Sequence, residues 1–438
     1  MVVEMPSLAP LRDQLPPPVS DNLLDQLRDR FPALAMWRAA RYEMDRLVTH
    51  QGDYFRSPRR GRPSSTEIFR HFTGSLVRSL ASRVESRSAD EGPRIASSAY
   101  FNVDRRFRHH GFQVDALPWV QCPPGRFLPF FLWAQVRLRL FRFGDFLTDS
   151  YFRLYEKTRK MLRLFFLERN HVALVLPFGM SFFEEVSLAV FQELGRPSFI
   201  FLHGMPGWYG KHDYANADYL VVWGDRIREH FVAAGYSPDR VIVSGHPTFD
   251  RFPPTSPLRY SLNDVLVLTK CINGAHFLGE SIIPDRASPL LFCQSIQKAL
   301  QPLGVSKVRL RPHPSESPGW YEEYLDPDFF RIDHQPFDQS LRQASLAIGP
   351  TSTSFVEALA AGVSYVVFEP GAGKRDLVGF PLVPPFDGQN GKVPVARTVP
   401  ALTEILQAGR RVDPTVWDDY IRTPFDLREV LGLLPAIP

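Results

Sequence analysis

The feature that most constrains the fold is a regular alternation of short apolar runs with segments of helical pattern, which starts at residue 171. Strands that alternate with helices of this length form βαβ units and a parallel sheet. In the first series we expect strands at His171–Leu176, Pro197–Leu202, Asp218–Trp223 and Arg240–Val243, and helices at Ser181–Leu194 and Asp225–Ala234.

The same alternation restarts after Phe252–Leu262, a proline- and serine-rich stretch that we predict to be a hinge. Here we expect strands at Asp264–Leu268, Lys307–Leu310, Phe329–Ile332, Ser345–Ile348 and Ser364–Phe368, with helices at Ser288–Leu300, Asp338–Ala344 and Ser354–Ala361. The sequence therefore predicts an α/β protein with two doubly wound, Rossmann-like domains that face a cleft.

A chain of 438 residues is too long for one ordinary core. We divide it into a helical or irregular N-terminal extension (1–92), a first α/β domain (93–251), a second α/β domain (263–410) and a helical tail (411–438). A helix over Asn22–Arg46 should break near Pro32, and the tail should contain helices at Ala401–Gln407 and Trp417–Leu433.

Composition excludes several classes of protein. A net charge of +4 gives no general case for a nucleic-acid partner, and three scattered cysteines fit neither a disulfide framework nor a zinc site. The first residues contain no apolar signal segment, and Phe127–Val136 has about half of the ~20 residues that a membrane-spanning helix needs. We expect a cytoplasmic protein that needs neither a metal nor a cofactor.

One amphipathic segment allows two interpretations, one of which is contact with a membrane. Gly144–Arg169 is amphipathic, and its polar face carries Arg153, Lys157, Lys160 and Arg163. Such a helix most often packs on its own domain. The alternative is a basic face that rests peripherally on the anionic lipid of the inner membrane face.

Pro350–Gly362 (PTSTSFVEALAAG) is the first candidate for chemistry, because it directly follows a predicted strand. Ser354 and Glu357 have the spacing of a helix capping box, and Gly362 suits the position after the helix. The hydroxyls of Thr351, Ser352 and Thr353 are then left over, beside a helix start that attracts anions. This pattern indicates a phosphate site, with a purely structural turn as the alternative.

The second candidate is Arg309–Pro314 (RLRPHP), which also follows a predicted strand. Arg309 and Arg311 share one face of that strand, and a guanidinium can donate two parallel hydrogen bonds to a phosphate. The prolines, including Pro314, stiffen the loop that presents His313. Lys270, after another strand, could also reach the phosphate, or it could be a surface lysine. We expect both motifs at one crevice.

These motifs resemble the His-Pro and Ser/Thr-rich motifs of GT-B glycosyltransferases that use cytidine-nucleotide donors. That group includes bacterial polysialyltransferases and the CDP-glycerol glycerophosphotransferases of teichoic acid synthesis. The resemblance implies that His313, Ser352, Thr353 and Ser354 hold the cytidine phosphate (CMP) part of the donor. Glu357 is similar to the acidic residue that many GT-B enzymes place on the donor ribose.

The first domain resembles the same group. Phe201–Pro206 (FLHGMP) is similar to the His-Gly-x-Pro of the glycerophosphotransferases, and Ala217–Asp250 is similar to the stretch that closes the first GT-B domain. The resemblance covers Val172–Glu369. Two motifs of these families are absent: the acidic pair followed by glycine that supplies the base of several sialyltransferases, and the aspartate of the serine motif, where Pro350–Thr351 stands.

His203 is our first choice for a catalytic base, because a neutral imidazole at a strand end can accept a proton near pH 7. Glu184 or Glu185 is the second choice, although one of the pair could be helix-start charge. The dipeptide His246–Pro247 is interpreted as structural.

We therefore expect a metal-independent glycosyltransferase of bacterial capsule or surface-polysaccharide synthesis. It would move a sugar or an alditol phosphate from a nucleotide-activated donor, expected to be cytidine-linked, to a saccharide or lipid-linked saccharide acceptor. The alternatives are a nucleotide-sugar 2-epimerase and a non-catalytic polysaccharide-binding subunit of an assembly complex.

Overall fold

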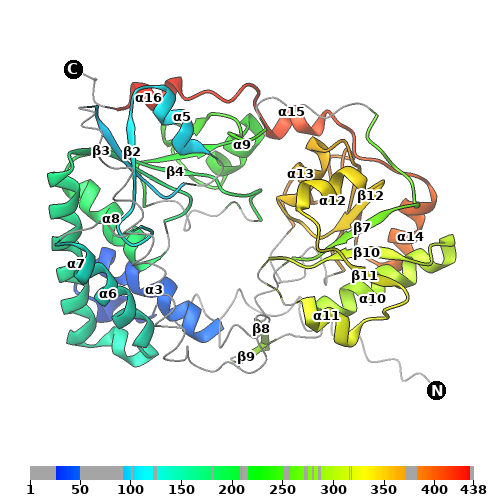
Figure 1. The fold of residues 1–438 in the computed structure, drawn as a ribbon, viewed down its shortest axis with the longest axis horizontal. Coiled ribbons are helices and arrows are strands. Elements are labelled where there is room, and N and C mark those ends of the chain that lie inside the picture. The colour runs from blue at the N-terminus through cyan, green and yellow to red at the C-terminus, as the bar shows by residue number, and fades with distance from the viewer. Residues whose placement is uncertain are drawn as a thin grey trace.

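The computed structural model has two lobes, each built on a parallel sheet (Figure 1). It describes residues 26–49, 92–99, 102–121, 126–179, 181–207, 209, 216–249, 257–270, 275–278, 281–284, 288–314, 316, 318–370 and 382–434. Most of the predicted N-terminal extension lies outside these residues.

The first sheet has six parallel strands in the order β2-β1-β3-β4-β5-β6. The later strands match the expected ones, while the sequence did not reveal the two early ones; the set is β1 (Arg94–Ser97), β2 (Gln113–Ala116), β3 (His171–Leu176), β4 (Ser198–Phe201), β5 (Tyr219–Val222) and β6 (Val241–Val243). The inner strands β3, β4 and β5 are largely apolar, as expected for a sheet that is covered on both faces.

Helices cover this sheet on both faces. In β3, Ala173 and Val175 face α5 (Val103–His109), while Leu174 and Leu176 face α8 (Phe182–Glu193). Alternate residues of a strand point to opposite faces, so one short run supplies both cores. Outside α8 lie α3 (Leu34–Thr49), α6 (Leu128–Leu140) and α7 (Asp149–Glu168), and α9 (Asp225–Ala233) follows β5.

The second sheet also has six parallel strands, in the order β11-β10-β7-β12-β13-β14. Numbered along the domain this is 3-2-1-4-5-6, the order of a dinucleotide-binding fold. The strands are β7 (Val265–Leu268), β10 (Val308–Arg311), β11 (Phe330–Ile332), β12 (Leu346–Gly349), β13 (Tyr365–Phe368) and the unexpected β14 (Val395–Ala396). A separate antiparallel hairpin pairs β8 (Ala275–Leu278) with β9 (Ser281–Pro284).

The helices of this lobe lie on both sides of its sheet (Figure 1). One side carries α10 (Ser288–Leu300) and α14 (Val399–Gln407), and the other carries α12 (Phe337–Gln343) and α13 (Ser354–Ala360). The sequence did not reveal α11 (Pro318–Tyr324), which lies between β10 and β11. The predicted fold class, α/β with two doubly wound GT-B-like domains, is confirmed.

The end of the chain returns to the first lobe. Leu427 and Val430 pack with the strands of the first sheet, and the backbone N–H of Arg422 donates to the carbonyl of Trp223 at 2.8 Å. The single helix predicted over Trp417–Leu433 is wrong. Two short helices, α15 (Val416–Tyr420) and α16 (Arg428–Gly432), replace it, because Pro424 lacks the N–H that a continuous helix needs.

The N-terminal helix and the predicted hinge are seen in part. The helix breaks near Pro32 as expected, since η1 (Arg28–Arg30) ends before it and α3 starts after it. Only the last residues of the hinge are described. There Arg259 pairs with Val363 and donates to the carbonyls of Leu341 and Ala361, so this end of the hinge is fixed to the second lobe.

Candidate functional site

The two motifs meet at the carboxyl edge of the second sheet, but their strands are not neighbours. The two motifs follow β10 and β12, and β7 lies between these strands. The order reverses at β7, and ligands of open α/β sheets bind at such a switch point. The residues that follow β7, Thr269 and Lys270, therefore lie between the two motifs.

Lys270 connects β7 to the serine-rich turn. Its Nζ donates to Thr351 Oγ1 at 3.1 Å. The backbone N–H and the hydroxyl of Thr351 both donate to Glu369 Oε1, at 2.6 and 2.8 Å. Glu369 is completely buried and directly follows β13. The prediction of a spare hydroxyl on Thr351 is wrong, because protein atoms use it on both sides.

Sequence reasoning missed Glu369 as a member of the site. The available signal was its position: a carboxylate immediately after a wholly apolar strand, at the edge where β7 and β12 also end. A buried carboxylate needs partners, and Thr351 supplies two of them. Glu369 thus fixes the start of the turn.

The start of α13 differs from the prediction. Ser354 is the first helical residue, Thr353 precedes the helix, and no side chain caps it, so the Ser354–Glu357 capping box is wrong. Gly362 does adopt the left-handed conformation expected of it, with φ of +73°. Ser352 Oγ accepts the N–H of Ser354 at 3.3 Å, which leaves this turn held by local bonds.

Glu357 lies on the side of α13 that faces Arg311. Burial raises the pKa of Glu357 to about 7, and the nearby charge of Arg311 opposes this rise. Arg311 lies over the ring of Phe337 at 5.1 Å and donates to Ser340 Oγ at 3.3 Å. The structure thus brings together the second arginine of one motif and the glutamate of the other.

Arg309, by contrast, is used by the protein itself. Its guanidinium pairs with Asp264 at 2.8 Å and with Asp333 at 2.6 Å, and it also donates to the carbonyl of Ser340. An arginine has five N–H donors, and these contacts use four of them. Arg309 therefore ties β10 to its neighbours, and we remove it from the proposed phosphate site.

His313 is presented by a fixed loop. Its backbone N–H donates to Thr269 Oγ1 and to Glu316 Oε2, both at 2.9 Å, while the ring is exposed and Pro314 follows at the surface. Desolvation by neighbouring atoms lowers the pKa of His313. Burial raises the pKa of Glu316 to about 7. The sequence analysis did not identify Glu316 as a residue of the site, although it lies three residues after His313, a spacing at which its carboxylate can accept the His313 backbone N–H.

His203 lies on the first lobe, close to the serine-rich turn of the second. Its Nδ1 is 3.1 Å from the carbonyl oxygen of Pro177, so Nδ1 donates and the neutral ring keeps its lone pair on Nε2. Burial lowers the pKa of His203. The backbone N–H of Met205 donates to Thr353 Oγ1 at 3.0 Å, which fixes the His203 strand end against the turn and uses the Thr353 hydroxyl.

Glu184 and Glu185, the second choice for a catalytic base, both accept hydrogen bonds from the protein. Glu184 Oε2 accepts the N–H of Ser181 at 3.1 Å in a capping box that starts α8. Glu185 accepts from the amide of Asn216, and burial raises its pKa to about 8. Glu43 of α3 also reaches this helix start, at 3.5 Å from the N–H of Phe182. Both predicted carboxylates lie buried within the first lobe.

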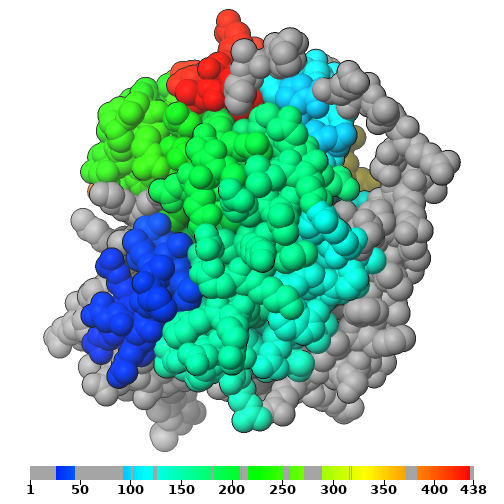
Figure 2. Space-filling model, turned by 90° about the vertical axis from the view of Figure 1, so that its left-hand side faces the viewer, coloured from blue at the N-terminus to red at the C-terminus, as the bar shows by residue number. Residues whose placement is uncertain are grey.

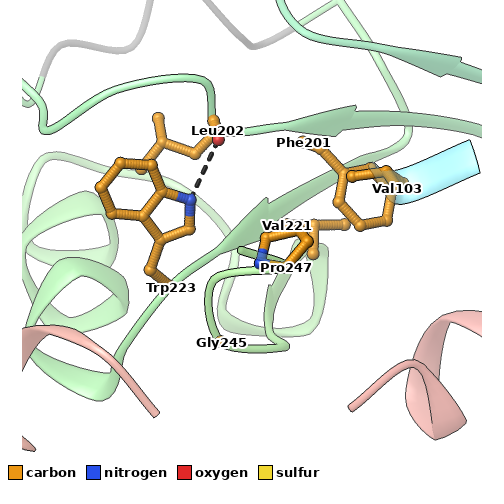
Figure 3. A pocket seen from close by; sticks show the side chains of 7 residues that line it. All are labelled: Val103, Phe201, Leu202, Val221, Trp223, Gly245 and Pro247. Atoms are coloured by element: carbon orange, nitrogen blue, oxygen red, sulfur yellow. Dashed lines mark hydrogen bonds between the residues drawn. The ribbon is translucent and has the colours of Figure 1, made fainter. Parts of the chain in front are cut away.

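A hollow of the first lobe carries no ligand site. It lies beside Trp223, whose indole N–H donates to the carbonyl of Leu202 at 3.0 Å, and it has no room for a water molecule (Figure 3). The nearby His246 is buried between aromatic rings, and burial lowers its pKa to about 3. The structural interpretation of His246 is confirmed.

Among the described residues, no cluster of histidine, cysteine, aspartate and glutamate could hold a metal ion. Within the same residues, no helix combines the length and the apolar character needed to cross a bilayer.

The fold and this edge of the second sheet define a GT-B-like α/β protein. No protein-family model matches the chain, and no curated protein matches it in sequence. Solved structures resemble it in fold. They include a putative UDP-N-acetylglucosamine 2-epimerase from Listeria monocytogenes (13% identity, 81% of this chain and 89% of that one, TM-score 0.41).

Two further examples show the range of these structures. The UDP-GlcNAc 2-epimerase from Neisseria meningitidis, bound to UDP-GlcNAc, has 10% identity over 78% of this chain and 97% of that one, with a TM-score of 0.45. The lipopolysaccharide outer core galactosyltransferase WaaB has 11% identity over 65% and 81%, with a TM-score of 0.35. At these levels the likeness concerns the fold alone.

Proposed function

We propose that the protein is an enzyme that acts on a nucleotide-activated sugar. The observation that carries the proposal is the set of polar groups at the switch point of the second sheet. Lys270, Arg311 and His313 come from the ends of β7 and β10, and the Thr351–Ser354 turn faces them from the end of β12. Cations beside hydroxyls and backbone N–H groups suit a phosphate that departs with negative charge.

A contact between the two lobes supports a role for both lobes in the proposed reaction. Thr353 of the proposed phosphate turn accepts the N–H of Met205, two residues after His203. A Cβ built on Gly204 would lie 2.8 Å from Thr353 Oγ1, so a larger residue at position 204 would force the Thr353 side chain to move. We propose that the Nε2 of His203 receives a proton from the sugar substrate, on the side opposite the nucleotide.

Two reactions fit this arrangement. In glycosyl transfer, His203 would deprotonate an acceptor hydroxyl while the phosphate leaves the donor. In 2-epimerisation, the donor itself would lose and regain a proton, and Glu357, with its raised pKa of about 7, is a second group that can exchange protons near neutrality. Several structures similar in fold are 2-epimerases, and a likeness of fold does not choose between the two reactions.

A thermal-shift screen of CMP, CDP, UDP, GDP and ADP tests the common part of the proposal. A nucleotide that binds the folded protein raises its melting temperature by mass action, and this rise should be smaller in Lys270→Ala. Lys298→Ala, at an exposed lysine of α10, is the matched control. Indifference of the wild-type protein to all five nucleotides would refute the proposal.

The reaction is then decided with the matching nucleotide sugars. An epimerase converts the donor alone into an epimer, which NMR detects through the coupling constants of the sugar protons. A transferase yields only slow hydrolysis until a saccharide acceptor is added. Binding of saccharide without any nucleotide would instead identify the non-catalytic subunit that the sequence left open.

A further inference from the structure

The outer face of α6 and α7 exposes four large apolar side chains. Trp133 and Leu140 of α6 are 45% and 55% exposed, and Leu164 and Leu167 of α7 are each 37% exposed. This face fronts the first lobe in Figure 2, where both helices lie at the surface in green and blue-green. Side chains of this size are ordinarily buried, so four along one helix pair mark a contact surface.

Cations alternate with these apolar groups on α7. Arg153, Lys157, Lys160 and Arg163 are all exposed, and they share the helical face of Leu164 and Leu167. The Nζ of Lys157 lies 4.7 Å from the centre of the Trp133 ring, which joins the two helices into one surface. We call these eight residues the α6–α7 face.

The acidic residues near this face are mostly neutralised. Glu156 pairs with Arg159 at 2.9 Å, and Glu168 pairs with Arg126. Asp149 remains, in the first turn of α7. In the part of the chain that the structure describes, Lys160 and Arg163 have no acidic partner, so the α6–α7 face keeps a net positive charge.

We propose that the α6–α7 face rests on a bilayer that contains anionic phospholipid. Tryptophan and leucine insert at the level of the head groups, while lysine and arginine side chains reach the lipid phosphates around them. The cations are spread over more than two turns of α7, which suits a broad anionic surface rather than one small anion. This proposal does not depend on the nucleotide-sugar function.

Vesicle sedimentation of the full chain tests the proposal. The protein should sediment with phosphatidylcholine vesicles that contain phosphatidylglycerol and stay in solution with phosphatidylcholine alone. Added salt should release it, because screening weakens attraction between exposed charges. Equal binding to both kinds of vesicle, or binding to neither, overturns the proposal.

Charge reversals locate the surface. The triple variant Lys157→Glu, Lys160→Glu, Arg163→Glu should lower the partition coefficient by at least about 100-fold, roughly fivefold for each lost cation. The triple variant Lys298→Glu, Lys307→Glu, Arg331→Glu makes the same change on the second lobe and should bind as the wild type does. Loss in both variants, or in neither, contradicts the assignment.

Trp133 gives a readout that does not depend on net charge. The blue shift of tryptophan fluorescence on vesicle binding should be smaller in Trp133→Phe, although this variant still sediments. If the wild type shows no shift, the apolar part of the surface does not insert. If the first triple variant changes the oligomeric state measured by light scattering without lipid, the face binds a second copy of the chain, and the lipid proposal is wrong.

Discussion

Lys270 and Thr351, 81 residues apart in sequence, are joined by a hydrogen bond of 3.1 Å across the switch point of the second sheet. The bond exists because β7, the first strand of the domain, lies beside β12, its fourth. It places the ammonium group of Lys270 beside the serine-rich turn, whereas the sequence had left a surface lysine as the alternative. The Thr351 hydroxyl in turn donates a hydrogen bond to the buried Glu369.

Lys270→Ala should weaken nucleotide binding by about 1.5–3 kcal/mol, roughly 10- to 150-fold, since a charged hydrogen-bond donor to phosphate is lost. Isothermal titration with the nucleotide found in the screen measures the change. Lys270→Arg, which keeps the charge, should bind with intermediate affinity. Wild-type affinity in Lys270→Ala would place the phosphate elsewhere.

His203→Gln should lower turnover by about 10²–10⁴-fold and leave nucleotide affinity within about twofold, because the lost group exchanges a proton and does not hold the phosphate. His109→Gln, at an exposed histidine of the first lobe, should have wild-type turnover. A large loss of nucleotide affinity in His203→Gln would show a structural role instead.

The pH profile of the wild-type enzyme gives a second test of His203. A base must be deprotonated to work, and burial lowers the pKa of His203 below its usual 6.5. Activity should therefore persist as the pH falls to 6.5 and should decline only below that value. A decline that is centred above pH 6.5 would argue against this histidine.

Glu316→Gln should change how stability depends on pH. Because the folded protein raises the pKa of Glu316 from 4.5 to about 7, its stabilising contribution is complete below pH 4.5 and is lost as the pH rises through 7. The wild type should lose roughly 3 kcal/mol of this contribution between these pH values, and the glutamine variant should not.

Melting temperatures of both proteins at several pH values between 4.5 and 8 measure this difference. Relative to the wild type, Glu316→Gln should become more stable as the pH rises. The exposed Glu322 provides the control, because Glu322→Gln should follow the wild-type curve. Parallel curves for Glu316→Gln and the wild type would mean that Glu316 is ionised throughout this range.

Arg309→Ala should destabilise the second lobe by about 3–5 kcal/mol, because it leaves the buried Asp333 without its cation. Thermal unfolding measures the loss. Arg331→Ala, at the exposed position of the neighbouring strand β11 that is paired with Arg309, should change stability by no more than about 0.5 kcal/mol. A stable Arg309→Ala protein with impaired nucleotide binding would return Arg309 to the phosphate site.

Local sequence pattern predicted the strands with wholly apolar residues well. In β3 and β13 every position is apolar or nearly so, because the sheet is covered on both faces, and this gives a clear signal. The early strands β1 and β2 were missed since they are short and carry arginine, glutamine and aspartate. The turn at Gly362 was predicted because only glycine adopts its conformation without strain.

The position of the candidate site was predicted from the sequence, but the residues that bind its side chains were not. Sequence spacing brought His313 and the serine-rich turn to one edge, but it could not show that β7 lies between them. It also could not show that Asp264 and Asp333 form ion pairs with Arg309, or that Glu369 accepts hydrogen bonds from Thr351. Hydrogen bonds between strand ends depend on the order of strands in the sheet, which no local pattern encodes.

The two α/β series can be predicted from local pattern, because the period of apolar residues is a property of each strand and helix. Which polar groups remain available to a ligand depends on how the strands are arranged in the sheet. Asp264, Asp333 and Glu369 are distant in sequence from the groups they bind, and the strand order alone brings them within hydrogen-bonding distance.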